Sequence, residues 1–194
     1  MIVQGSLEWF AMRCGKVTAS RVADVLAKTK TGWGAGRANY AAELIAERLT
    51  GATAPSFTNA AMQWGTDQEP VYEIGFVDHP EITMSGASPD GLVGVWGLVE
   101  IKCPNTATHL DTLLSETVPG KYITQMQWQM ACTGREWCDF VSFDPRLPES
   151  MALFVTRVHR DVSHILELET EVAAFIAEID DKVARLTERY ASAA

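Results

Sequence analysis

The period of the hydrophobic residues changes twice along this chain, and that change limits the folds it can adopt. Apolar residues first recur every three or four positions, alternate in short segments between about residues 81 and 103, and then return to helical spacing. We expect a loop at 28–36, strands at 136–143 and 151–159, and helices at residues 6–13, 18–27, 37–50, 59–77, 106–116 and 119–133. This order predicts an α/β fold in which helices flank a mixed central sheet.

The last segment has the pattern of a long amphipathic helix. Its apolar residues are spaced three or four positions apart and are Ile165, Leu168, Val172, Ile176, Ile179, Val183 and Leu186. We expect this stripe to pack on the core of the protein rather than on a partner.

Length and composition indicate one globular unit. The 194 residues contain neither an internal repeat nor a low-complexity linker, so we expect a single domain over residues 1–194. A content of 47% hydrophobic and 21% charged residues excludes a disordered or fibrous protein. No run is apolar enough to span a membrane, and the start lacks a signal-peptide pattern. Four cysteines without a CxxC pair suggest neither zinc nor disulfides, so a reducing cytoplasm is the expected location.

The charge of the chain is unevenly distributed. A net charge of −9 argues against nucleic-acid binding when it is taken alone. However, residues 11–40 carry six basic side chains and one acid, whereas residues 161–194 carry eight acids and three basic side chains. Residues 11–40 can therefore bind a polyanion, although chance clustering of basic residues on solvated helix faces explains the pattern equally well.

One strand-like segment, residues 97–104, places an acid beside an amine. Because side chains alternate across a strand, Glu100 and Lys102 share one face, and we expect the opposite face, with Val99, Ile101 and Cys103, to point into the core. A carboxylate can hold a divalent cation, and the nearby ammonium can orient a water molecule. Taken alone, the pair is more simply explained as a solvated ion pair.

A second carboxylate precedes this strand in a turn. The sequence Ser88-Pro89-Asp90-Gly91 is typical of a β-turn, and a short hairpin after it would bring Asp90 and Glu100 close together. Two carboxylates and the Ile101 carbonyl suit Mg²⁺, which keeps several water ligands. No hydroxyl or thiol is paired with an evident base, so metal-assisted hydrolysis is the reaction class that we expect.

These two motifs, Pro89-Asp90 and Glu100-Ile101-Lys102, resemble the core of the PD-(D/E)xK nucleases. The resemblance extends to six motifs in the order seen in the family of phage lambda exonuclease and the YqaJ-type viral recombinases. The motifs are WFAMRCGKVTAS (9–20), QWGTDQE (63–69), SPDGL (88–92), LVEIKCP (98–104), YITQMQWQM (122–130) and Asp144-Pro145-Arg146. The resemblance spans roughly residues 6–160 and implies a restriction-endonuclease-like core.

The resemblance also implies roles for individual residues in catalysis. Asp90, Glu100 and the Ile101 carbonyl would hold a catalytic Mg²⁺ (or Mn²⁺), Glu69 would support a second ion, and Lys102 would position or activate the attacking water. Glu69 taken alone is equally well explained as an exposed acid on a helix.

Further residues match the DNA-binding positions of the family. Met62 matches a wedge that splits the terminal base pair, and Lys30 matches a basic loop residue that tracks the duplex. The residues that match the pocket for a 5′-terminal phosphate are Arg13, Ser20, Ser88 and Gln125. Singly, these have plainer explanations, such as a surface charge for Arg13 and a helix cap for Ser20. The tryptophans Trp9, Trp64 and Trp128 are expected to pack in the core rather than stack on bases.

The function implied by the resemblance is that of a Mg²⁺-dependent 5′→3′ exonuclease on duplex DNA ends, which leaves 3′ single-stranded overhangs for phage-type recombination. A homotrimeric ring around the DNA and a single-strand annealing protein as partner are implied as well, in a bacterial host and from a phage or prophage. Two alternatives remain open. One is a site-specific endonuclease or a CRISPR-adaptation-type exonuclease of the same core, and the other is a non-catalytic protein that binds DNA ends.

Overall fold

The computed structural model describes residues 5–53 and 75–191. Up to residue 53 its elements are α1 (Leu7–Arg13), β1 (Val17–Thr18), the 3₁₀ turn η1 (Ala19–Arg21), α2 (Val22–Leu26), β2 (Lys28–Thr29), β3 (Gly32–Trp33) and α3 (Ala35–Thr50). From residue 75 onward they are β4 (Val77–Asp78), β5 (Ser85–Ala87), β6 (Gly91–Val93), β7 (Gly97–Lys102), α5 (Thr106–Ser115), α6 (Gly120–Thr133), β8 (Trp137–Phe143), η2 (Glu149–Met151), β9 (Leu153–His159) and α7 (Val162–Ala191).

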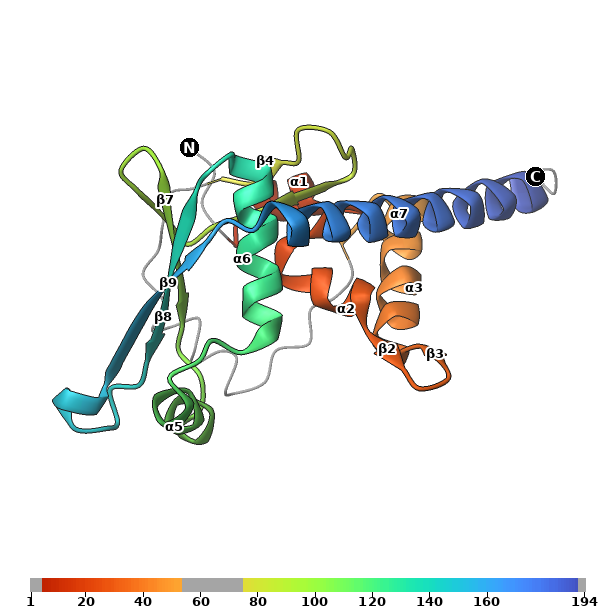
Figure 1. Ribbon diagram of the computed structural model, residues 1–194. Helices are drawn as coiled ribbons and strands as arrows, with labels where there is room; N and C mark the ends of the chain where they lie inside the picture. Colours follow the sequence, from red (N-terminus) through yellow and green to blue (C-terminus); the bar gives the residue numbers. More distant parts are fainter. Residues whose placement is uncertain (1–4, 54–74, 192–194) are drawn as a thin grey trace.

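The main sheet has the order β6-β7-β8-β9 and is mixed, as the sequence predicts. β7 and β8 are parallel, and the outer strands β6 and β9 run antiparallel to their neighbours. A smaller sheet has the order β1-β5-β4, and β2 pairs with β3. Figure 1 shows the main sheet at one side of the molecule, α6 beside it, and α7 running from the end of β9 across to α3 and beyond. This arrangement confirms the predicted α/β fold.

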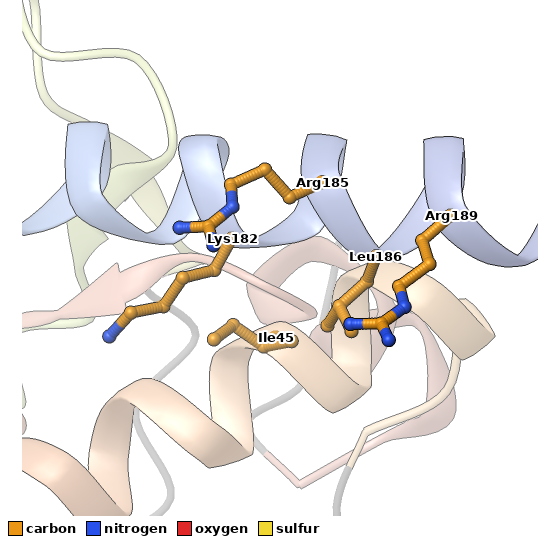
Figure 2. Close-up of a pocket in the computed structure, with 5 residues that line it drawn as sticks. All are labelled: Ile45, Lys182, Arg185, Leu186 and Arg189. Atoms are coloured by element: carbon orange, nitrogen blue, oxygen red, sulfur yellow. The ribbon is translucent and has the colours of Figure 1, made fainter.

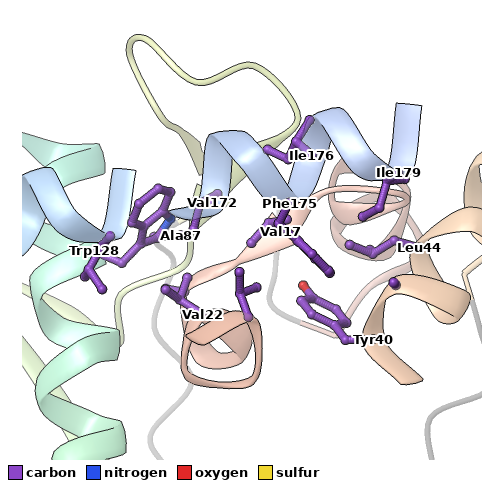
Figure 3. Packing of buried hydrophobic residues seen from close by; sticks show 14 of the residues in the cluster. Val17, Val22, Tyr40, Leu44, Ala87, Trp128, Val172, Phe175, Ile176 and Ile179 are labelled. Atoms are coloured by element: carbon purple, nitrogen blue, oxygen red, sulfur yellow. The ribbon is translucent and has the colours of Figure 1, made fainter. Parts of the chain in front are cut away.

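Helix α6 lies between two hydrophobic clusters. Toward the main sheet, its Met126 and Met130 pack with Leu98, Cys138 and Phe140. On its other side, residues of α6 join the larger cluster, in which α7 packs over α2, α3 and the small sheet (Figure 3). The members that α6 and α7 contribute to this larger cluster are Trp128, Cys132, Leu168, Val172, Phe175, Ile176 and Ile179.

The apolar stripe predicted for the last helix is therefore core over most of its length. It is buried from Ile165 to Ile179, whereas Leu186, near the C-terminal end, is 38% exposed. No helix in the described ranges is long and apolar enough to cross a membrane.

Most predicted helix boundaries agree with the structure. α3 and α6 end at Gly51 and Gly134, whose φ values of 69° and 68° place them in the left-handed region that glycine adopts without strain. The helix expected at 18–27 is a 3₁₀ turn followed by the short α2, and the loop expected at 28–36 contains the hairpin β2–β3. The helix expected at 59–77 lies almost wholly outside the described residues, and its last residue, Val77, is in β4.

The prediction of which face of β7 is buried was wrong. Of the three residues expected in the core, Cys103 is buried, but Val99 and Ile101 are only partly buried. On the opposite face, Leu98 and Glu100 are 0% exposed. The physical reason is that α6 covers this second face and supplies hydrogen-bond donors to the carboxylate. A buried charged group that is fully hydrogen-bonded avoids most of the cost of its burial.

Candidate active site

Glu100 is the centre of the candidate site. It lies in β7 with its side chain fully buried, and three donors contact it. Gln125 Nε2 donates to Oε1 at 2.5 Å and Gln129 Nε2 donates to Oε2 at 2.6 Å, while Lys102 Nζ lies 2.5 Å from Oε1. Both glutamines come from α6, where a spacing of four residues puts them on one side of the helix. The carboxylate is thus held in one orientation by two separate elements.

Asp90 lies next to this strand, as the turn-and-hairpin pattern predicts. It directly precedes β6, and its Oδ2 accepts a hydrogen bond from Ile101 N at 2.7 Å. β6 begins opposite Val99, so Ile101 lies beyond the paired part of β6 and β7. The N–H and C=O of one residue point to the same side of a strand. The Ile101 carbonyl therefore faces the same side as Asp90.

Asp90, Glu100 and the Ile101 carbonyl fit a hard divalent cation. All three ligand atoms are oxygens, and the two carboxylates are buried, with Asp90 9% and Glu100 0% exposed. A carboxylate accepts about four bonds, so the three donors on Glu100 leave one direction for a cation. Within the described residues no group of three acidic, histidine or cysteine side chains is arranged around a metal position. Glu69, which was predicted to support a second ion, lies outside those residues.

The negative charge of the site also affects a neighbouring thiol. Burial raises the pKa of Cys138 well above its usual range, and the Glu100 and Asp90 carboxylates raise it further. The thiol therefore stays protonated and does not compete for a metal or act as a nucleophile. All four cysteines lie in the described residues as free thiols.

Arg13 and Ser88 form a second cluster at the entrance to the Asp90 turn. Arg13 Nη1 donates to Ser88 Oγ at 3.4 Å, and Trp9 Nε1 donates to the same oxygen at 3.2 Å. The guanidinium of Arg13 lies 3.9 Å from the centre of the Trp9 ring. Burial lowers the pKa of Arg13 to about 10, so the side chain is still charged at neutral pH. Trp9 is buried, as predicted, and holds the arginine in place.

The ion pairs of residues 11–40 distinguish Arg13 and Lys30 from the other four basic side chains. Those four pair with acids within the protein and are Lys16, Arg21, Lys28 and Arg37. In the described part of the chain, Arg13 and Lys30 form no ion pair. The two residues that the resemblance assigns to DNA are therefore the ones whose charge is not used to hold the fold.

The remaining predicted residues are less closely grouped. Ser20 is exposed in η1 and Lys30 is exposed between β2 and β3. Neither forms a hydrogen bond or ion pair with Arg13 or Ser88 in the described ranges. Gln125 contacts Glu100, so it belongs to the carboxylate cluster as the structure stands. Met62 and Trp64 lie outside the described residues.

Two contacts of the site were not assigned a role from the sequence. Gln129 donates to the second oxygen of Glu100. In the sequence, only its spacing of four residues from Gln125 indicates that it lies on the same face of the helix. Asp144 accepts from Arg146 Nε at 2.6 Å, and Arg146 Nη2 also donates to the Pro104 carbonyl at 3.0 Å. This pair joins the loop after β8 to the end of β7, just beyond Lys102.

The mixed sheet flanked by helices, with Asp90 bound to the backbone of β7 one residue beyond Glu100, belongs to the class of restriction-endonuclease-like nuclease folds. Within that class, the chain belongs to the family of YqaJ-like viral recombinase domains, whose model matches residues 8–76 and 71–136. No match was found among curated proteins.

Solved structures agree with this assignment. The crystal structure of an alkaline exonuclease (LHK-Exo) from Laribacter hongkongensis is 53% identical, covers 97% of this chain and 100% of its own, and superposes with a TM-score of 0.89. LHK-Exo in complex with dAMP gives the same identity and coverage and a TM-score of 0.90. A phage-related exonuclease from Haemophilus somnus 129PT, at 15% identity, covers 88% of this chain and 96% of its own with a TM-score of 0.61, and shares the fold.

Proposed function

We propose that this protein is an exodeoxyribonuclease that uses Mg²⁺ to degrade one strand of duplex DNA from its 5′ end and leaves a 3′ single-stranded overhang. An exonuclease role agrees with its family and with its 53% identity to an alkaline exonuclease. The observation that carries the proposal is that Asp90 accepts a hydrogen bond from Ile101 N, between the paired residues Glu100 and Lys102 at the end of β7.

The chain's own residues divide the work of hydrolysis. Asp90, Glu100 and the Ile101 carbonyl would hold Mg²⁺, and Glu69 would support a second ion. When bound, the metal supplies charge stabilisation at the phosphate and lowers the pKa of a water molecule. Lys102, whose Nζ lies 2.5 Å from Glu100, is positioned to orient the attacking water beside this carboxylate. Gln125 and Gln129 keep Glu100 from rotating away from the site.

The cluster around Arg13 supports the proposed direction of digestion. The charged Arg13 guanidinium forms no ion pair in the described residues and donates to the hydroxyl of Ser88. Ser88 is only two residues from Asp90 in sequence, so this cluster suits a terminal phosphate next to the metal site. Arg13, Ser88, Ser20 and Gln125 would bind the 5′-phosphate, Met62 would separate the last base pair, and Lys30 would follow the duplex. The chain would act as a homotrimeric ring around the DNA, together with a single-strand annealing protein.

Asp90→Ala tests the metal assignment. The variant should fold normally and lose hydrolysis of linear duplex DNA with Mg²⁺ or Mn²⁺. Unchanged digestion would contradict the assignment. Folding with loss of hydrolysis would also exclude the alternative that the chain only binds DNA ends, because the wild type would then be active through this site.

Two substrates test the mode of attack. A linear duplex with one labelled 5′ end should be digested faster when that end carries its phosphate, and Arg13→Ala should remove this preference. Indifference of the wild type to the phosphate would contradict the roles of Arg13 and Ser88. A circular plasmid should remain uncut, whereas cutting would favour a site-specific endonuclease of the same core.

A further inference from the structure

The C-terminal end of α7 forms a pocket with α3. This cavity, the α3–α7 pocket, has a volume of about 300 Å³ and is lined by Ile45, Lys182, Arg185, Leu186 and Arg189. Figure 2 shows Ile45 and Leu186 facing each other from the two helices, with Lys182 and Arg189 on either side. Figure 1 places this end of α7 beyond α3, on the side of the molecule away from the main sheet.

The pocket collects all the basic side chains of an acidic segment. Residues 161–194 contain eight acids and three basic residues, and the three basic residues are the ones that line this pocket. Their spacing along α7 puts them on one side of the helix, because residues three, four and seven positions apart share a face. The pocket is thus a positive site on a protein whose net charge is −9.

Two of the acids of α7 pair with cations that do not line this pocket. Glu178 pairs with Arg37 at 2.6 Å, and Asp180 pairs with Arg48 at 2.5 Å. In the described part of the chain Arg185 forms an ion pair with Asp181 at 3.5 Å, whereas Lys182 and Arg189 form no ion pair. The positive charges of Lys182 and Arg189 are the ones that a ligand in the pocket can use.

The floor of the pocket is apolar. It consists of Ile45, which packs against the edge of the main hydrophobic cluster, and Leu186, which is 38% exposed. A cavity of this kind accepts an aliphatic side chain, which loses contact with water when it enters. The combination of an apolar floor and a rim of cations favours a ligand that carries both an apolar group and negative charges.

We propose that the α3–α7 pocket docks an acidic segment of a partner protein, which inserts one apolar side chain between Ile45 and Leu186. Amphipathic segments bind in this way to a groove between helices, with charged residues around the apolar anchor. A DNA duplex is less suited to the pocket, because its phosphates gain nothing from the apolar floor. This inference does not depend on the proposed nuclease activity, since the pocket lies apart from Asp90 and Glu100.

The first test uses a defined probe on the full-length protein. The probe is a short fluorescein-labelled peptide of glutamates that flank one leucine, and its binding is measured by fluorescence anisotropy. The variant Lys182→Glu/Arg189→Glu should bind it at least about tenfold more weakly than the wild type. The control Ala184→Glu adds a negative charge on the opposite, exposed side of α7 and should bind within about twofold of the wild type. Equal losses in both variants, or no loss in either, would overturn the proposal.

The second test asks whether the apolar floor takes part. The wild type should bind the leucine peptide about tenfold more tightly than a peptide in which serine replaces the leucine. Leu186→Ser should abolish this difference while its binding of the serine peptide stays unchanged. A wild type that does not distinguish the two peptides has a charged patch rather than a docking pocket, and the proposal fails.

Two further measurements exclude other occupants. The molar mass of Lys182→Glu/Arg189→Glu, determined by light scattering, should equal that of the wild type, whereas a smaller mass would identify the pocket as a contact between copies of this chain. Binding of a duplex with both ends closed by hairpins should be the same in the two proteins. If it weakens as much as peptide binding does, the surface binds polyanions in general and the proposal is overturned.

Discussion

The regions around Glu100 and Asp144 each bury a carboxylate near the end of a strand, and the two strands are parallel neighbours. Both side chains are 0% exposed. Asp144 is held by Arg146, only two residues further along the chain, and this contact lowers its pKa to about 2. Glu100 is held by two neutral amides from α6 and by Lys102. The two carboxylates are equally buried, and they differ in the side chains that contact them.

The difference is one of chemistry. An arginine that forks onto a carboxylate satisfies both of its oxygens and neutralises its charge, which suits a structural anchor. The two amides orient Glu100 without cancelling its charge, and the ion pair with Lys102 is made by Oε1, so Oε2, which is held by the neutral amide of Gln129, keeps its attraction for a cation. We therefore interpret Asp144 as a support for the site and Glu100 as a ligand within it.

The largest difference should appear in activity. Glu100→Gln removes a charged metal ligand but keeps the shape of the side chain, so hydrolysis should fall by about a thousandfold or more. The midpoint of denaturant unfolding should fall, because the ion pair with Lys102 is lost and the new amide nitrogen faces a donor from Gln125 or Gln129. Asp144→Asn is the matched control and should retain most of the activity per folded molecule. Comparable losses of activity in both variants would remove the distinction between the two regions.

The next effect concerns the orientation of Glu100. Gln129→Met keeps a similar volume but removes the donor to Oε2, so the affinity for Mg²⁺ should fall about tenfold to a hundredfold. The Mg²⁺ concentration that gives half-maximal activity measures this change. Gln127→Met is a useful control, because Gln127 lies on the same helix and donates to the His159 carbonyl instead. An equal shift in both variants would indicate a general disturbance of α6.

A smaller effect is expected on stability at the second carboxylate. Asp144→Asn weakens the contact with Arg146 and should lower the free energy of unfolding by about 1 to 2 kcal/mol. The value is modest because Arg146 is about half exposed, with 46% of its side chain accessible. Urea denaturation followed by circular dichroism measures the change. A variant as stable as the wild type would show that this pair does not anchor the loop.

The smallest effect is the pH dependence of that difference. Because the pKa of Asp144 is lowered to about 2, its stabilisation is fully present above its unfolded pKa of about 4. It is lost as the pH falls from about 4 toward about 2. The stability difference between the wild type and Asp144→Asn should therefore shrink over this range, and a difference that stays constant would refute the assignment.

The sequence predicts those parts of the fold that depend on local pattern. The lengths of α3 and α6 follow from apolar spacing and a terminal glycine, and the approach of Asp90 to β7 follows from a turn and a hairpin. The buried face of β7 could not be predicted in this way. It depends on two glutamines in a helix more than twenty residues away, and only packing brings them to Glu100.

The same limit applies to the basic residues. Six basic side chains in residues 11–40 look alike in the sequence, and pairing with distant acids separates four of them from Arg13 and Lys30. The hairpin β2–β3 was expected as a loop because strands of two residues carry too little alternation to be recognised. Side-chain roles that depend on long-range pairing need the structure.

Helix α6 holds the glutamines of the site on one side and supplies Trp128 to the main core on another. Loss of the core therefore releases Glu100 at the same time, since one rigid element serves both. On heating, this protein should lose its activity in the same cooperative transition in which it unfolds, without a folded but inactive intermediate.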